Sequence, residues 1–145
     1  MTEAIRDGHY MACDPGNTSG VAIFNSDGSL NSMNQYVKED FMDYLRDYPE
    51  PYPRVVIIEE YRVFPNKAST HAYSKVDTIQ IIGMIKAAAH KWGAEAVEQP
   101  LQAKTMGYKY AGMKPPSDHS KSHSPDAVAH GYYYLVKNNV IKVKI

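Results

Sequence analysis

The sequence predicts an α/β fold in which helices cover both faces of a mixed five-stranded sheet. Two observations carry this prediction. Residues 9–14, 20–24 and 30–37 are three short strand-like stretches joined by tight turns, which is typical of antiparallel hairpins. After them, strand-like stretches alternate with helical patterns, as in sheets covered by helices. The expected order is βββ-α-β-α-β-α, in one domain over residues 1–145, a length that supports a hydrophobic core.

The first half of the chain carries clear turn, strand and helix signals. The segments "PGNTSG" and "NSDG" are turns that separate the three opening strands. The segment "KEDFMDYLRDY" then has aromatic and leucine side chains at helical spacing, and "PEPYP" ends that helix. "RVVIIEE" follows as a run of β-branched residues, which is typical of a strand buried on both faces.

The second half is expected to hold two helices and one strand. A helix over about residues 74–92 carries an apolar arc of roughly 160°, wider than one core contact needs. The additional apolar surface either lies deeper in the same core or contacts a second subunit. "EAVEQPLQAK" is interpreted as the fifth strand, and residues 105–121, rich in Gly, Pro, Lys and Ser, as a loop. The last helix is expected to start with Ser124 as N-cap, Pro125 at the first position and Asp126 next.

Composition excludes several classes of protein. The longest purely aliphatic run, residues 55–58, is far too short to span a membrane, and residues 1–9 lack the apolar segment of a signal peptide. The single cysteine, Cys13, excludes an internal disulfide and is expected to be a buried apolar residue in a reducing compartment. We therefore expect a cytoplasmic protein.

A net charge of zero hides a strong asymmetry along the chain. Residues 1–61 hold four Lys or Arg and eleven Asp or Glu, whereas residues 62–121 hold nine Lys or Arg and four acids. This pattern favours a cation-binding centre beside a surface for polyanions. The alternative is that ordinary solvated faces fell unevenly along the sequence.

Three acidic residues occupy comparable places at the ends of expected elements. Asp14 ends the first strand, Glu59 ends the buried fourth strand, and Asp126 opens the last helix. Asp14 also suits a turn before Pro-Gly, and Asp126 suits any helical first turn. Glu59 places a charge directly after a buried strand, which is harder to explain by local structure alone. Glu60 should point to the opposite side of that strand, so only one of the two is expected in a shared site.

Clustered carboxylates repel one another unless a cation lies between them. Their oxygens suit Mg²⁺, for which Mn²⁺ substitutes. A pair of such ions activates water and stabilises the leaving oxygen of a phosphodiester, so we expect two ions per active site. His123, three residues before Asp126, is expected to be a fourth ligand or a proton-transfer group, with His119 and Asp118 as alternatives.

With these residues, the sequence resembles the RuvC-type Holliday junction resolvases, within the RNase H-like superfamily. The matching segments are "CDPGNTSGVAIF", "VVIIEEYRVF" and "SHSPDAVAHGYYYL". The family has a first strand ending in Asp-Pro-Gly, a catalytic Glu after a hydrophobic strand, and Asp or His three residues before a helix-opening Asp-Ala. The resemblance implies an RNase H-like fold. It also implies a metal-dependent endodeoxyribonuclease of DNA recombination and repair that resolves four-way junctions by paired phosphodiester hydrolysis.

The resemblance implies that Asp14, Glu59, His123 and Asp126 are catalytic and metal-binding residues. It also implies a homodimer with the helix around Ile81–Trp92 at the interface, in a bacterial or phage-infected cell. The chain is short for a bacterial member, and "EEYRVFPNKASTHAYSK" is more like phage-encoded relatives. Ribonuclease H itself fits less well, because its catalytic Glu lies on the helix after the third strand.

The segment after the catalytic Glu combines basic and aromatic residues, as expected of a surface that binds branched DNA. Lysines neutralise phosphates, and aromatic rings stack on unpaired bases. Family members wedge an aromatic into the junction centre, a role open to Tyr61 or Phe64. The expected DNA-binding residues are Tyr61, Arg62, Phe64, Lys67, Lys75, Lys104, Lys109, Lys114 and Lys121. Core packing is the alternative for each aromatic, and plain solvation for each lysine.

The leading hypothesis is thus a Mg²⁺-dependent, dimeric, structure-selective DNA endonuclease. Two alternatives remain open. One is an RNase H-like nuclease acting on flaps or RNA–DNA hybrids. The other is a non-catalytic nucleic-acid-binding module of the same fold.

Overall fold

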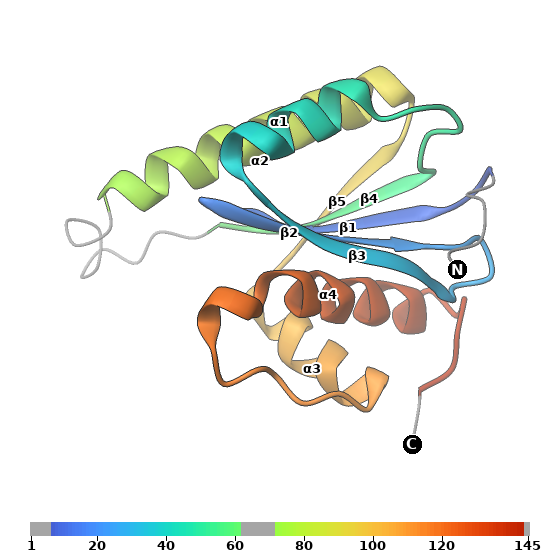
Figure 1. Cartoon of the computed structure of the whole chain (residues 1–145). Helices are drawn as coiled ribbons and strands as arrows, with labels where there is room; N and C mark the ends of the chain where they lie inside the picture. Colours follow the sequence, from blue (N-terminus) through green and yellow to red (C-terminus); the bar gives the residue numbers. More distant parts are fainter. Residues whose placement is uncertain (1–6, 62–71, 144–145) are drawn as a thin grey trace.

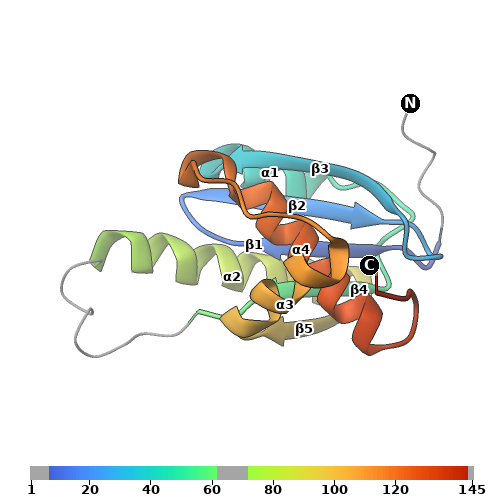
Figure 2. The same cartoon turned by 90° about the horizontal axis from the view of Figure 1, so that it is seen from below.

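In the computed structural model, which describes residues 7–61 and 72–143, five strands form one sheet between two layers of helices (Figures 1 and 2). The strands are β1 Tyr10–Asp14, β2 Thr18–Phe24, β3 Leu30–Val37, β4 Val55–Glu59 and β5 Glu95–Gln99. Their order in the sheet is β3-β2-β1-β4-β5. β2 pairs antiparallel with β1 and β3, whereas β4 pairs parallel with β1 and β5. The mixed five-stranded sheet that the sequence predicts is confirmed.

The helices are divided between the two faces of the sheet. They are α1 Lys38–Asp47, α2 Ala72–Trp92, α3 Leu101–Ala111 and α4 His123–Lys137. α1 and α2 cover one face, and α3 and α4 cover the other (Figure 1). A short 3-10 turn, His119–Lys121, leads into α4. Within the described ranges, no helix combines the length and apolar character that a membrane span requires.

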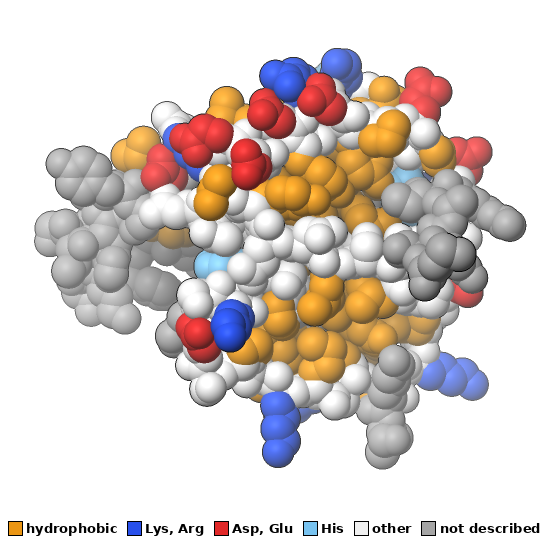
Figure 3. Space-filling view, viewed as in Figure 1, with side chains coloured by type: hydrophobic (Ala, Val, Ile, Leu, Met, Phe, Trp, Pro, Cys, Tyr) orange, Lys and Arg blue, Asp and Glu red, His pale blue; other side chains and the backbone are white. Residues whose placement is uncertain are grey.

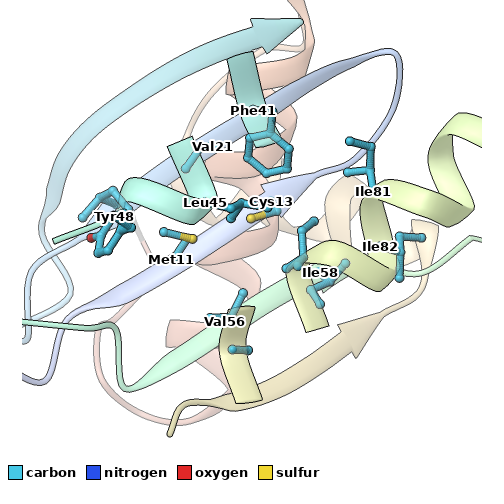
Figure 4. Close-up of a cluster of buried hydrophobic side chains, with 13 residues drawn as sticks. Met11, Cys13, Val21, Phe41, Leu45, Tyr48, Val56, Ile58, Ile81 and Ile82 are labelled. Atoms are coloured by element: carbon cyan, nitrogen blue, oxygen red, sulfur yellow. The ribbon is translucent and has the colours of Figure 1, made fainter. Parts of the chain in front are cut away.

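Each face of the sheet carries its own apolar cluster, because side chains alternate along a strand. Met11 and Cys13 of β1 pack with α1 and α2 in the cluster drawn in Figure 4. Tyr10 and Ala12 join the cluster under α4 instead. The side chains of β4 alternate between the same two clusters. The last residue of each of these two strands therefore faces the α3/α4 layer.

The apolar arc of α2 faces the chain's own core. Ile81, Ile82, Ile85 and Ala89 are buried in the α1/α2 cluster, and the other members of the arc pack against it. This is one of the two outcomes that the width of the arc left open. Among the α2 side chains that the structure describes, the large apolar ones that are exposed are Val76 and Ile79, each 55% exposed.

The expected fifth strand is present but shorter than "EAVEQPLQAK", and the loop expected over residues 105–121 begins only after Ala111, for one common reason. β5 ends at Gln99, and α3 begins two residues later and runs to Ala111. Pro100 stands at the N-cap position of α3. Proline cannot continue a strand's hydrogen-bond ladder but is tolerated at a helix start, so the chain changes from strand to helix there.

The expected start of α4 is also wrong. The helix begins at His123, so Ser124, Pro125 and Asp126 all lie inside its first turns. The backbone N–H of Ser124 donates to Oε1 of Gln35 at 3.2 Å, and Nε2 of Gln35 donates to the carbonyl oxygen of Ser120 at 3.1 Å. A side chain of β3 therefore satisfies the helix start that the Ser124 hydroxyl was expected to cap.

Candidate metal-binding site

Asp14 and Glu59 emerge together because they end two neighbouring parallel strands. Cys13 of β1 pairs with Ile58 of β4, so the next residue of each strand lies at the same edge of the sheet. The alternation of side chains directs both carboxylates to the α3/α4 layer. Asp14 is 6% exposed, and the side chain of Glu59 is 16% exposed.

The start of α4 lies directly on β2, next to Asp14. Gly20 is the β2 partner of Asp14, and a Cβ on it would lie 1.9 Å from the carbonyl oxygen of His123. Only glycine allows this approach, which places Nδ1 of His123 3.4 Å from Oδ2 of Asp14. Asp126, three residues further along α4, is 9% exposed. α4 thus brings two further candidate residues to the two strand ends.

α3, which lies beside α4 (Figure 2), contributes a lysine and a tyrosine to the same group. Nζ of Lys104 lies 3.3 Å from Oε1 of Glu59 and 3.3 Å from Oδ2 of Asp126. The hydroxyl of Tyr108, one turn later, donates to Oδ1 of Asp126 at 2.5 Å. Gly107 lets the two helices meet closely, because a Cβ there would clash with the backbone of Ala129 on α4. Asp126 is therefore held from two sides by α3.

Burial and the mutual repulsion of the carboxylates shift the pKa values of the group. Burial, the shared hydrogen bond with Glu59 and the charges of Glu59 and Asp126 raise the pKa of Asp14 well above its usual range. Burial alone would raise the pKa of Glu59 too, but hydrogen bonds from His130 and Asp14 and the charge of Lys104 lower it. Burial would lower the pKa of Lys104, but the surrounding carboxylates outweigh this and raise it. The pKa of Asp14 is thus raised and that of Glu59 lowered, beside the ammonium group of Lys104.

These residues fit a hard divalent cation by their chemistry. Three carboxylates supply the oxygen ligands that Mg²⁺ and Mn²⁺ prefer, and burial together with the neighbouring carboxylates raises the pKa of Asp14. Among the residues that the structure describes, no three His, Cys, Asp or Glu side chains already stand in ligand geometry. The ammonium group of Lys104 lies within salt-bridge distance of two of the carboxylates, where it balances their charge.

A hollow of about 370 Å³ opens beside Asp126, between α3 and the segment that precedes α4. It is lined by Lys104, Thr105, Tyr108, Lys109, Met113, Pro115, Pro116, Ser122 and Asp126. A larger groove of about 860 Å³ lies between β3 and α1, on the acidic side of the molecule (Figure 3), and contains none of the carboxylates described above. The smaller hollow reaches the group of site residues at Asp126, Lys104 and Tyr108.

The expected DNA-binding residues are distributed unevenly. Lys109, Lys114 and Lys121 are exposed in the α3/α4 layer, whereas Lys104 points into the carboxylate group. Tyr61 is half-buried against the α1/α2 cluster, which agrees with the core-packing alternative. Arg62, Phe64 and Lys67, and the side chain of Lys75, lie outside the described residues.

Three residues in or beside the group were not among the predicted site residues. The sequence signal for Tyr108 is its position four residues after Lys104, which places both side chains on one helix face. His130 contacts Glu59 at 3.1 Å and Gln99 contacts His130. The signal for His130 was a histidine inside the apolar run of α4, four residues after Asp126.

No known protein family matches the sequence, and neither does any curated protein. The fold does match solved structures. Two structures of RuvC from Thermus thermophilus each superpose with a TM-score of 0.62 over 94% of this chain and 99% of theirs. One of them, at 13% identity, is described as being in complex with a Holliday junction substrate, and the other is 15% identical. At these identities the likeness establishes the RNase H-like fold.

Proposed function

We propose that this chain is a divalent-metal-dependent endonuclease that resolves four-way DNA junctions. The observation that carries the proposal is the convergence of Asp14, Glu59 and Asp126, from two strand ends and a helix start, beside an open hollow. The fold likeness to a protein described in complex with a Holliday junction substrate supports this substrate class.

Asp14, Glu59, Asp126 and His123 would hold the metal, Mg²⁺ or Mn²⁺, as a pair of ions. When bound, such ions activate a water molecule and stabilise the leaving oxygen of a phosphodiester. His123, whose Nδ1 lies 3.4 Å from Oδ2 of Asp14, would move a proton at its ring nitrogen.

The remaining residues of the group prepare it for substrate. Lys104 neutralises Glu59 and Asp126 and lines the hollow, so that its ammonium can also face a phosphate oxygen. The hydrogen bond from Tyr108 fixes the orientation of Asp126. The exposed Lys109, Lys114 and Lys121 add positive charge to the layer that carries the site.

Paired cleavage of a junction needs two active sites related by symmetry, and we therefore propose a homodimer. Val76 and Ile79 support the use of α2 in its interface. They lie three residues apart, on one face of the helix, and both are exposed.

Cleavage of a labelled, immobile four-way junction in Mg²⁺ tests the function. A flap, an RNA–DNA hybrid and a linear duplex of matched sequence are compared with it, together with Asp14→Asn. We expect symmetric nicks in the junction alone, abolished by the substitution. If the chain cuts the flap or the hybrid in preference to the junction, that DNA or hybrid becomes the assigned substrate. If the chain binds the junction without any cutting, it is a non-catalytic binding module.

A further inference from the structure

His130 is a histidine whose two ring nitrogens both have partners at the site. It lies one turn after Asp126 on α4 and is 0% exposed. Its Nε2 lies 3.1 Å from Oε1 of Glu59, and its Nδ1 lies 3.1 Å from Nε2 of Gln99. Gln99 ends β5, is 5% exposed, and is the register partner of Glu59 on β4. Gln99, His130 and Glu59 therefore form a continuous hydrogen-bonded chain.

The directions of these hydrogen bonds follow from what each group can donate. Nε2 of Gln99 also donates to the backbone carbonyl oxygen of His130 at 3.0 Å, and a carbonyl oxygen only accepts. This contact fixes the orientation of the amide, whose second hydrogen is donated to Nδ1 of His130. A neutral imidazole that accepts at Nδ1 carries its hydrogen on Nε2, and that hydrogen is donated to Glu59.

His130 consequently holds the Oε1 oxygen of Glu59. Oε1 accepts from His130 and also faces Nζ of Lys104 at 3.3 Å, and neither contact involves Oε2. The lysine is a long side chain that is 22% exposed, whereas the imidazole is closed in on all sides. His130 is thus the rigid partner, and it removes rotational freedom that Glu59 would otherwise lose on binding a ligand.

We propose that His130, kept in one tautomer by Gln99, is a positioning residue that presents the Glu59 carboxylate to a divalent cation. The proposal rests on the proposed function and adds two residues to it that do not themselves contact the metal. Partners of this kind typically contribute about 10–100-fold to metal affinity.

Binding of Mn²⁺ to the full chain, followed by the electron paramagnetic resonance signal of free Mn²⁺, tests the proposal without DNA. We expect His130→Phe, which keeps a ring but no donor, to weaken Mn²⁺ affinity by about 10–100-fold. His130→Gln, which retains an N–H group, should recover part of this loss. Gln99→Met leaves the imidazole in place but frees its tautomer, and should weaken affinity by about tenfold. The matched control is His90→Phe, because His90 is exposed on α2.

Thermal unfolding without metal identifies which variants are folded, and affinities are compared among those. Unchanged Mn²⁺ affinity in folded His130→Phe overturns the proposal while leaving the function intact, even if the variant is less stable. If His130→Phe does not fold, Gln99→Met decides in the same way. A wild-type chain that binds no Mn²⁺ overturns both the proposal and the function. A chain that behaves as expected toward Mn²⁺ but cuts no DNA overturns the function alone.

Discussion

The contact between Gly20 and the start of α4 gives the sharpest test of how the site is assembled. In Gly20→Ala, the added Cβ would lie 1.9 Å from the carbonyl oxygen of His123, whereas ordinary contact begins near 3.4 Å. The neighbouring atoms are backbone, so the first turn of α4 must retreat by about 1.5 Å. Overpacking of this kind costs about 1–3 kcal/mol of unfolding free energy. A displacement of about 1 Å at a catalytic group can lower the rate about 100-fold.

We therefore expect Gly20→Ala to lose about 2 kcal/mol in urea unfolding and about 100-fold in the rate of junction cleavage. Gly83→Ala is the matched control. Gly83 lies inside α2, and its added Cβ would have no side chain and no backbone of another described element within 4 Å, so alanine should stabilise the chain by up to about 1 kcal/mol. A Gly20→Ala variant with wild-type stability and wild-type cleavage would refute the close approach of α4 to β2.

Three further predictions concern charge and assembly. Lys104→Met leaves the charges of Glu59 and Asp126 uncompensated and should lower the unfolding free energy by about 3 kcal/mol in EDTA. Part of this loss should be recovered in Mg²⁺, and an equal loss in EDTA and in Mg²⁺ would contradict the role of Lys104 as a counter-ion. Because the pKa of Asp14 is raised above its ordinary value of 3.8, the folded chain retains a proton that the unfolded chain has lost. In EDTA, the unfolding free energy of wild type should therefore fall relative to that of Asp14→Asn as pH rises above 3.8, and below 3.8 the difference between the two should stay constant. A constant difference over the whole pH range would argue against the raised pKa. Ile79→Lys should shift sedimentation from dimer to monomer, and a monomeric wild type would exclude the dimer proposal.

The strands and their acidic ends could be predicted because their signals are local. Period-two and β-branched patterns mark strands, and a carboxylate that ends a buried strand has few structural explanations. α3 could not be predicted in this way. It begins after Pro100 without a capping side chain and contains Gly107, a poor helix former, in its interior. Its stability comes from close packing on α4, which depends on residues distant in sequence.

The same limit applies inside the site. Lys104 was correctly noticed as a cation but was expected to face DNA, because no sequence pattern tells where a lysine points. His130 and Gln99 lie 31 positions apart and meet only because α4 packs on the face of the sheet at which β5 presents Gln99. Contacts of this kind are determined by topology and packing, and the local spacing of residues in the sequence does not predict them.

The division of the site between sheet and helix has a consequence for biosynthesis. Asp14 and Glu59 are fixed by neighbouring parallel strands, whereas Asp126 reaches them only once α4 has docked on β2 and α3. During translation, α4 is the last of these elements to leave the ribosome. A nascent chain that has already formed its first four strands therefore still lacks a complete set of carboxylates. The proposed nuclease would be inert while it is being made, and cutting would begin only after the last helix has joined the fold.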